Sequence, residues 1–236
     1  MKKIETDFIE TDFNFKYTLE GSDSIVTNMR VSIIASSWFQ DKRGDKYDEG
    51  EEAGYADLIV INMAMANKNK ANPWEIIDGI SVNVIEFSDV LFSKDGKLDE
   101  TLARKLWANR PVSFPATLDL TTFAIAKKLV VRPRYRGLGA TLALNYDLAT
   151  RFNFDFLVTQ AFPLQYEALA TENNPSDYKG YDANAEDLEA AKTRLVNYYI
   201  RKCGMTRLKK GQDYLLLLPN LPNKALHNYE RRTFQE

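Results

Sequence analysis

The residues with the clearest chemical potential lie in a short basic turn that carries two glycines. Arg132, Arg134 and Arg136 precede or enter this turn, which continues through Gly137 and Gly139. A helix that begins here would present backbone N–H groups and partial positive charge, and glycines would let a phosphate approach the backbone. The turn therefore predicts a binding site for a ligand that carries phosphate groups.

Two common phosphate-binding motifs do not fit this turn. The dinucleotide fingerprint Gly-x-Gly-x-x-Gly requires a third glycine where Leu142 stands. The P-loop pattern Gly-x-x-x-x-Gly-Lys-Ser/Thr does not occur in the chain. An unrelated α/β domain whose glycines have only a structural role therefore stays open as an alternative.

The composition excludes several kinds of site. The 236 residues include one histidine, His227, and one cysteine, Cys203. A zinc site built from Cys and His needs about four ligands, and an intramolecular disulfide needs two cysteines, so neither is expected. Residues 40–54 are acidic but lack the spacing of a calcium-binding loop, and we expect no metal. Cys203 ends an apolar helix face and is expected to be a small buried side chain.

Charge and hydropathy limit the partners. Thirty-one Lys and Arg against 33 Asp and Glu leave a net charge of −2, without the basic surplus of most nucleic-acid-binding proteins. No apolar run approaches the ~18–20 residues of a membrane span, and the N-terminus lacks the apolar stretch of a secretory signal. We therefore expect a cytoplasmic protein that binds neither nucleic acid nor membrane.

The elements around the turn predict how it is positioned. Residues 123–131 read as an apolar strand that ends before Pro133, residues 141–152 read as a helix, and residues 154–162 read as a second strand. The order strand, glycine turn, helix, strand is typical of a parallel strand pair with a crossover helix. The turn would then lie at the carboxyl end of the first strand.

The other segments are assigned by periodicity and by helix start and stop signals. Residues 163–183 are a polar excursion, residues 185–203 a long helix that ends at Gly204, and residues 213–218 a final strand. In the N-terminal half we expect a strand with alternating Phe13, Phe15 and Tyr17, a surface loop over 40–54, strands over 57–66 and 81–92, and helices that start near Asn72 and Asp99. Residues 29–39 fit either a helix or a strand.

The turn and its flanks resemble the acyl-CoA-binding motif of the GNAT N-acetyltransferase superfamily. That motif is written Gln/Arg-x-x-Gly-x-Gly/Ala, and here Arg134, Gly137 and Gly139 take its three defined positions. The hydrophobic lead-in Leu-x-Val-x-Pro is met by Leu129, Val131 and Pro133. The resemblance covers about residues 123–218, while residues 1–120 fit only as a set of leading strands and helices.

The resemblance implies a fold and a ligand. The fold would be one α/β (α+β) domain over residues 1–236, with a GNAT-type mixed central sheet flanked by helices and with insertions. The co-substrate would be acetyl-CoA, whose pantetheine arm would pair with the main chain of Leu129 and Val131. Its pyrophosphate would lie on the turn, against Arg134, Arg136, Gly137, Leu138, Gly139, Ala140 and Thr141.

The implied activity is acyl transfer to the amine of a small molecule or peptide. The tyrosine that usually acts as the acid in this family falls on Ile200, with Tyr199 one residue earlier, so Tyr199 is the catalytic residue the resemblance suggests. No glutamate stands at a usual base position. A catalytically inactive CoA-binding or regulatory protein on the same fold is therefore the main alternative, and a homodimer is left open.

Overall fold

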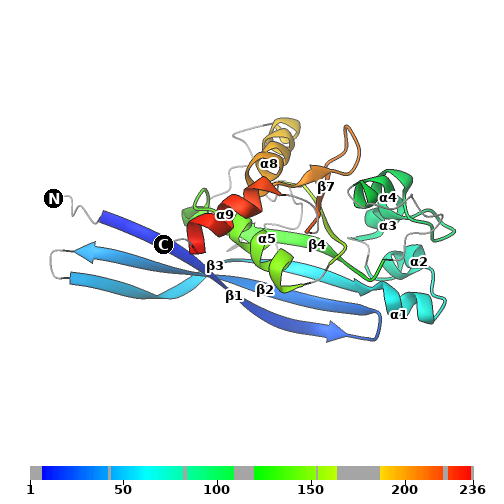
Figure 1. Cartoon of the computed structure of the whole chain (residues 1–236), viewed down its shortest axis with the longest axis horizontal. Coiled ribbons are helices and arrows are strands. Elements are labelled where there is room, and N and C mark those ends of the chain that lie inside the picture. The colour runs from blue at the N-terminus through cyan, green and yellow to red at the C-terminus, as the bar shows by residue number, and fades with distance from the viewer. Residues whose placement is uncertain are drawn as a thin grey trace.

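The computed structural model describes residues 7–41, 44–81, 84–108, 120–152, 154–163, 187–219 and 223–234. These residues form a seven-stranded mixed sheet with helices against both faces, as Figure 1 shows. The mixed α/β class expected from the sequence is thus confirmed. No helix in the described part of the chain is both long and apolar enough to cross a lipid bilayer.

The strand order places the predicted parallel pair at the centre of the sheet. Across the sheet, the strands are β1 (Asp7–Ser22), β2 (Val26–Asp41), β3 (Gly44–Asn62), β4 (Thr122–Val131), β5 (Phe156–Gln160), β7 (Tyr214–Leu217) and β6 (Thr206–Arg207). Only β4 and β5 run parallel, and the other neighbours are antiparallel. A parallel pair needs a crossover connection, which α5 (Ala140–Arg151) supplies.

The helices divide into two groups. Those on one side are α1 (Met63–Lys68), α2 (Pro73–Asp78), α3 (Ile85–Leu91) and α4 (Glu100–Trp107). Those on the other side are α5, α8 (Leu188–Cys203) and α9 (Lys224–Phe234). Figure 1 shows the first group together at one end of the molecule, and the second over the middle of the sheet.

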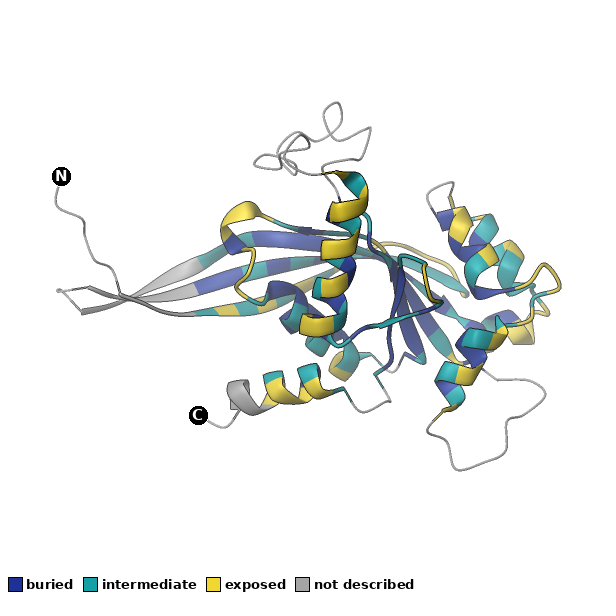
Figure 2. Cartoon of the chain, turned by 90° about the horizontal axis from the view of Figure 1, so that it is seen from above, coloured by how far each residue is buried: buried dark blue, intermediate teal, exposed yellow. Residues whose placement is uncertain are grey.

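Strand β4 belongs to both hydrophobic cores because successive side chains of a strand point to opposite faces. Ala124 and Ala126 pack in the core formed with α5, α8 and α9. Phe123 and Ile125 pack in the core formed with α1 to α4, where Phe123 stacks on Phe156 with ring centroids 4.9 Å apart. Figure 2 shows the buried residues concentrated where the helices cover the strands.

Side chains at the helix starts explain where several helices begin. Asn72 accepts a hydrogen bond from the N–H of Trp74 at 3.0 Å, and Pro73 occupies the first helical position of α2. Asp99 accepts from the N–H groups of Thr101 and Leu102 at the start of α4. Both starts were predicted, because a capping side chain and a proline act on neighbouring backbone groups alone.

The elements around the glycine turn also agree with the sequence. Strands β4, β5 and β7 and helices α5 and α8 occupy the predicted segments to within three residues at each end. Gly204 follows α8 in the left-handed conformation with φ +67°, as expected for a glycine that ends a helix. Phe13, Phe15 and Tyr17 lie in β1, and residues 29–39 lie in β2.

Three expectations in the N-terminal half need correction. Among the described residues of 81–92, helix α3 stands where a strand was expected, and Val84, Phe87 and Leu91 are buried at helical spacing. The strand predicted over 57–66 is confirmed over 57–62 as part of β3, but it ends at Asn62, where α1 begins.

The third wrong expectation concerns the polar stretch over 40–54. From residue 44 onward it belongs to strand β3, which pairs with β2. Pairing of the backbone with a long neighbouring strand has overridden the polar composition. The polar excursion predicted over 163–183 lies, from residue 164 onward, outside the described residues.

Strands β3 and β4 approach closely at Gly54, which pairs with Val131. A Cβ atom added at Gly54 would lie 2.0 Å from the carbonyl oxygen of Val130 and 3.0 Å from the Cα of Val131. The obstacle is backbone and cannot move aside without separating the strands. Glycine is therefore required here by the spacing of the two strands.

Gly54→Ala is expected to lower the free energy of unfolding by about 2–4 kcal/mol, because β3 and β4 must separate to admit the methyl group. Gly21→Ala is the matched control, since a Cβ at Gly21 would meet no atom within 4 Å. The control should change stability by less than about 0.5 kcal/mol. Urea unfolding of the two variants measures both values, and equal stabilities would contradict the close approach.

Candidate functional site

The glycine turn joins β4 to α5 and has a backbone that favours glycine at two places. After β4 the chain forms a short 3-10 helix over Pro133–Tyr135 and then turns into α5. Gly137 has φ +81° and Gly139 has φ +94°, both in the left-handed region that other residues rarely adopt. Gly139 is the residue that precedes the first turn of α5. The predicted helix start is thus confirmed.

The space in front of the turn is open. A Cβ atom built on Gly137 or on Gly139 would meet no atom within 4 Å, and Leu138 between them is 45% exposed. No side chain of the described residues caps α5, in contrast to the capped starts of α2 and α4. The start of α5 thus has no capping side chain from its N-cap residue, and Gly137, Leu138 and Gly139 before it are open to solvent, while Ala140 and Thr141 are themselves buried.

The arginines of the turn are paired with carboxylates that sequence reasoning did not connect to them. Arg132 forms an ion pair with Glu52 at 2.9 Å, and Arg134 forms one with Glu51 at 2.7 Å. Arg134 also lies over the Tyr135 ring, 4.6 Å from its centroid. Glu51 and Glu52 belong to β3, the segment that the sequence assigned to a surface loop.

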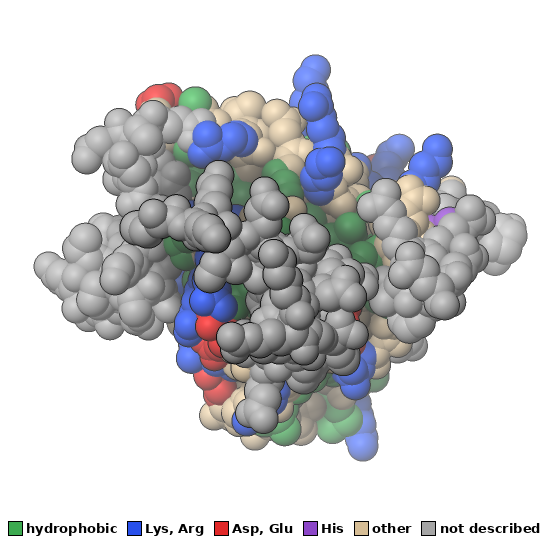
Figure 3. Space-filling model, turned by 90° about the vertical axis from the view of Figure 1, so that its left-hand side faces the viewer, with side chains coloured by type: hydrophobic (Ala, Val, Ile, Leu, Met, Phe, Trp, Pro, Cys, Tyr) green, Lys and Arg blue, Asp and Glu red, His purple; other side chains and the backbone are tan. Residues whose placement is uncertain are grey.

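These ion pairs leave the turn able to accept an anion. Each partner of the two pairs keeps at least 42% of its side chain exposed, and exposed pairs of this kind contribute only about 0–1 kcal/mol. A phosphate group can therefore take the place of a glutamate at small cost. Arg136 donates from Nε to the carbonyl oxygen of Val131 at 3.1 Å, which folds its side chain back over the end of β4. On the end of the molecule seen in Figure 3, Lys and Arg side chains adjoin Asp and Glu side chains along one margin.

The two central strands part just before the turn. Strand β4 pairs with β5 from Phe123 to Ala126, and the pairing does not continue to Val131. At the last pair, the Thr159 hydroxyl donates to the carbonyl oxygen of Ala126 at 3.1 Å. Leu129 and Val131, the strand residues predicted to contact a ligand, both lie beyond this point. The pairing thus ends towards the same end of β4 as the glycine turn.

A β-bulge marks the place where the strands part. Asp57 of β3 pairs with Lys128, whereas its neighbour Leu58 pairs with Ala126, so Lys127 is an extra residue in β4. A bulge bends its strand and leaves backbone groups without the regular ladder partners. Sequence reasoning missed this feature, because nothing in the pattern of residues 123–131 distinguishes a bulged strand from a regular one.

Asp57 is the carboxylate that the register places beside the bulge. Arg30 of β2 donates to both of its oxygens, at 2.7 Å from Nε and 3.0 Å from Nη2. The Arg30 guanidinium also lies 4.5 Å from the centroid of the Tyr55 ring. Both carboxylate oxygens of Asp57 are thus engaged by one guanidinium group. Among the described residues, no group of three or more His, Cys, Asp and Glu side chains could hold a metal ion.

The structure places Tyr199, the catalytic residue suggested by the sequence, in the core between α8 and the sheet. Its side chain is 7% exposed and belongs to the same cluster as Val196 and Leu144. Its neighbour Tyr198 interacts instead with Thr141, in the first turn of α5. Burial raises the pKa of Tyr198, while the hydrogen bond with Thr141 acts in the opposite direction. The Tyr198 hydroxyl thus lies near both Thr141 and the thiol of Cys203, which also raises its pKa.

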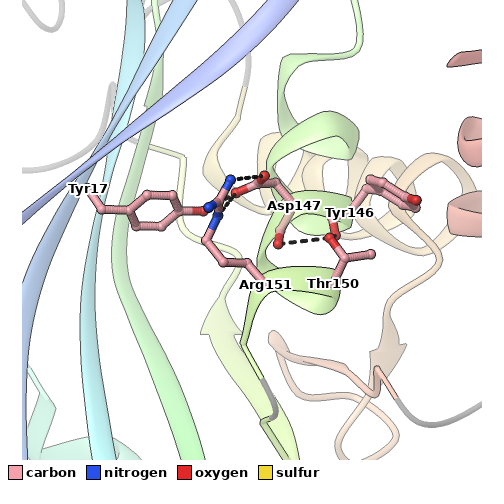
Figure 4. A network of polar contacts seen from close by, with 5 residues as sticks. All are labelled: Tyr17, Tyr146, Asp147, Thr150 and Arg151. Atoms are coloured by element: carbon pink, nitrogen blue, oxygen red, sulfur yellow. Dashed lines mark hydrogen bonds and ion pairs between the residues drawn. The ribbon is translucent and has the colours of Figure 1, made fainter. Parts of the chain in front are cut away.

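A polar network holds the other end of α5 against the sheet (Figure 4). The Tyr17 hydroxyl of β1 donates to Asp147, and Arg151 forms an ion pair with Asp147 at 3.1 Å. Arg151 also lies 5.1 Å from the centroid of the Tyr17 ring. Burial, followed by the Asp147 carboxylate, raises the pKa of Tyr17 well above its ordinary value. The network fixes the C-terminal half of α5, the helix whose first turn borders the open surface.

Comparison with protein-family models, with curated proteins and with solved structures finds no match for this chain.

Cys203 is expected to be unreactive in the folded protein. Its side chain is fully buried, as the sequence predicted, and burial raises the pKa of the thiol to about 12. Reaction needs the thiolate, so modification by a disulfide reagent at pH 8 should be at least about 100-fold slower in the native protein than in urea. The raised pKa also links the thiol to folding stability. The stabilisation that comes from keeping the buried thiol protonated is fully present below pH 9, the ordinary pKa of a thiol, and is lost as the pH rises towards 12. Rapid labelling of native protein would contradict this placement.

Proposed function

We propose that the chain is a GNAT-fold, acyl-CoA-dependent N-acyltransferase that transfers an acetyl group from acetyl-CoA to an amine. The observation that carries the proposal is the end of the β4–β5 pairing at Ala126, towards the end of β4 where the glycine turn leads into α5. A helix start and a strand segment beyond its parallel partner thus lie at the same end of β4. The resemblance of residues 129–142 to an acyl-CoA-binding motif supports the same ligand.

The pyrophosphate of the co-substrate would lie on the first turn of α5. The backbone N–H groups of Gly139, Ala140 and Thr141 would donate to it, and Arg134 and Arg136 would supply positive charge. The conformation of Gly137 and Gly139 and the open space around them fit a ligand at this place.

The pantetheine arm would run along β4 beyond its last pair with β5. The main chain of Leu129 and Val131 would bind it in the manner of a strand, which carries the thioester towards the bulge at Lys127. A backbone N–H in this bulged segment would stabilise the oxyanion that forms on the thioester carbonyl.

The reaction would be direct attack by a neutral amine. The amine nitrogen forms a bond to the thioester carbon, the carbon–sulfur bond breaks, the amine loses a proton to a base or water, and the departing thiolate accepts a proton. We assign the acid to Tyr198, whose hydroxyl interacts with Thr141, in preference to the buried Tyr199. The acceptor would be the amine of a small molecule or a peptide.

A CoA-binding protein without catalysis is the second candidate function. The ion pair of Asp57 favours this second candidate. Asp57 is the carboxylate beside the bulge, and Arg30 donates hydrogen bonds to both of its oxygens. Without a base, the site would still bind the co-substrate. The two candidates therefore share a ligand and differ in turnover.

Binding is tested with a matched pair of glycine variants. Acetyl-CoA and CoA should raise the melting temperature of the unmodified protein by mass action, and Gly139→Arg should abolish this shift because its side chain fills the phosphate site. Gly211→Arg is the control: Gly211 also has a positive φ, +83°, and open space around it, but lies in the turn before β7. The control should lose comparable stability and keep the ligand-induced shift. Absence of any shift at millimolar ligand would refute both candidate functions.

Turnover is tested by the release of CoA thiol over a panel of polyamines, amino acids, aminoglycosides and peptides. Tyr198→Phe should lower kcat by about 10²- to 10⁴-fold with little change in CoA binding, as expected for loss of a general acid. Tyr199→Phe is the control and should keep most of the activity. Equal losses in the two variants would contradict the choice of Tyr198, and silence of the whole panel with retained binding would favour the second candidate.

A further inference from the structure

Strand β1 is the outermost strand at one end of the described sheet. It runs from Asp7 to Ser22 and pairs only with β2 among the described strands (Figure 1). Alternate backbone N–H and C=O groups of such a strand point away from the sheet and can pair with another strand. The register with β2 is regular between two irregularities, at Phe8/Glu10 and at Leu19/Gly21. The regular stretch of the edge is therefore centred near Asn14.

The side chains of this stretch alternate between the two faces of the sheet. Phe13, Phe15 and Tyr17 are partly buried and pack against the core beneath α5. Asp12, Asn14, Lys16 and Thr18 are exposed on the other face. Each face thus presents its own row of side chains to a strand that would add at this edge.

We propose that β1 pairs antiparallel with β1 of a second copy of this chain, with Asn14 opposite Asn14. In this register, residues whose numbers add up to 28 lie opposite each other. Asp12 of one copy then faces Lys16 of the other, and Phe13 faces Phe15. A two-fold axis perpendicular to the sheet repeats each pair, so the dimer contains two Asp12–Lys16 pairs and two Phe13–Phe15 pairs.

Charge selects this register over its neighbours. If the numbers of paired residues added up to 24, Asp12 would lie opposite Asp12. If they added up to 32, Lys16 would lie opposite Lys16. A sum of 26 would put Asp12 opposite Asn14 and Lys16 opposite Glu10, which lies at the irregular end of the strand. A sum of 30 would put Asp12 opposite Thr18 and Glu10 opposite Glu20. Opposite charges and aromatic pairs across strands are favourable, whereas like charges directly opposite are unfavourable.

The geometry of the fold suits such a dimer. Antiparallel pairing about a perpendicular axis keeps equivalent faces on the same side, so the two copies of α5 lie on one face of a continuous sheet. The partly buried Phe13 and Phe15 of each copy gain an aromatic neighbour. The strand irregularities that flank the regular stretch limit the contact to about ten residues in each copy, so the contact is small.

The experiment measures sedimentation equilibrium of the full chain from about 1 to 500 µM, with charge variants of β1. K16D places an acidic side chain opposite Asp12, and D12K places a basic one opposite Lys16, so each variant alone should weaken dimerisation by about tenfold or more. K210D changes the net charge by the same amount as K16D, at an exposed residue before β7, and should dimerise like the unmodified protein.

Two further samples test the register itself. The double variant D12K/K16D restores opposite charges and should recover the dimer. A mixture of D12K with K16D should form a heterodimer more tightly than either variant dimerises alone, because both of its cross-strand pairs are again of opposite charge. Folding of each variant is checked by its melting temperature.

A monomeric unmodified protein over the whole concentration range would overturn the proposal. A dimer that is indifferent to K16D and D12K, or that the double variant does not recover, would also overturn it. Acetyl-CoA is absent from every sample, so the result does not depend on the proposed function.

Discussion

The parallel pairing of β4 with β5 over Phe123–Ala126 is the constraint on which the arrangement of the candidate site depends. Because parallel strands need a crossover, α5 must start at the carboxyl end of β4 and return across one face of the sheet. Its first turn therefore lies beside the strand end. The pairing is short, so the remainder of β4, as far as Val131, extends beyond its parallel partner. The uncapped start of α5 and the strand segment beyond the parallel pair thus arise from one topological feature.

The electrostatics of the turn follow from its neighbours in the sheet. Arg132 and Arg134 look like a concentration of positive charge in the sequence, but β3 places Glu52 and Glu51 against them. These exposed pairs hold the guanidinium groups near the turn without a large gain in stability. A ligand with several negative charges can compete for them, whereas a weak anion has less advantage. Positive charges at the turn are therefore largely offset by negative charges beside them, as they are in the chain as a whole.

The sequence by itself determined the features that depend on adjacent residues. Hydrophobic periodicity predicts the two strands and the helix around Gly139. The glycines predict the turn, because its backbone is left-handed at Gly137 and Gly139. The start of α2 at Asn72 and Pro73, and that of α4 at Asp99, depend on side chains that bond to N–H groups two or three residues away. The stop of α8 at Gly204 is of the same kind. Interactions between residues so close in sequence can be predicted from the sequence alone.

Only the tertiary structure decided the features that depend on which segments become neighbours. Residues 81–92 are rich in residues that suit strands, yet packing against the sheet selects helix α3. The polar residues 44–54 form part of β3 because β2 offers its backbone as a partner. The bulge at Lys127 and the contact between Tyr198 and Thr141 likewise join segments far apart in sequence. Their energies come from pairing and burial, which local patterns do not encode.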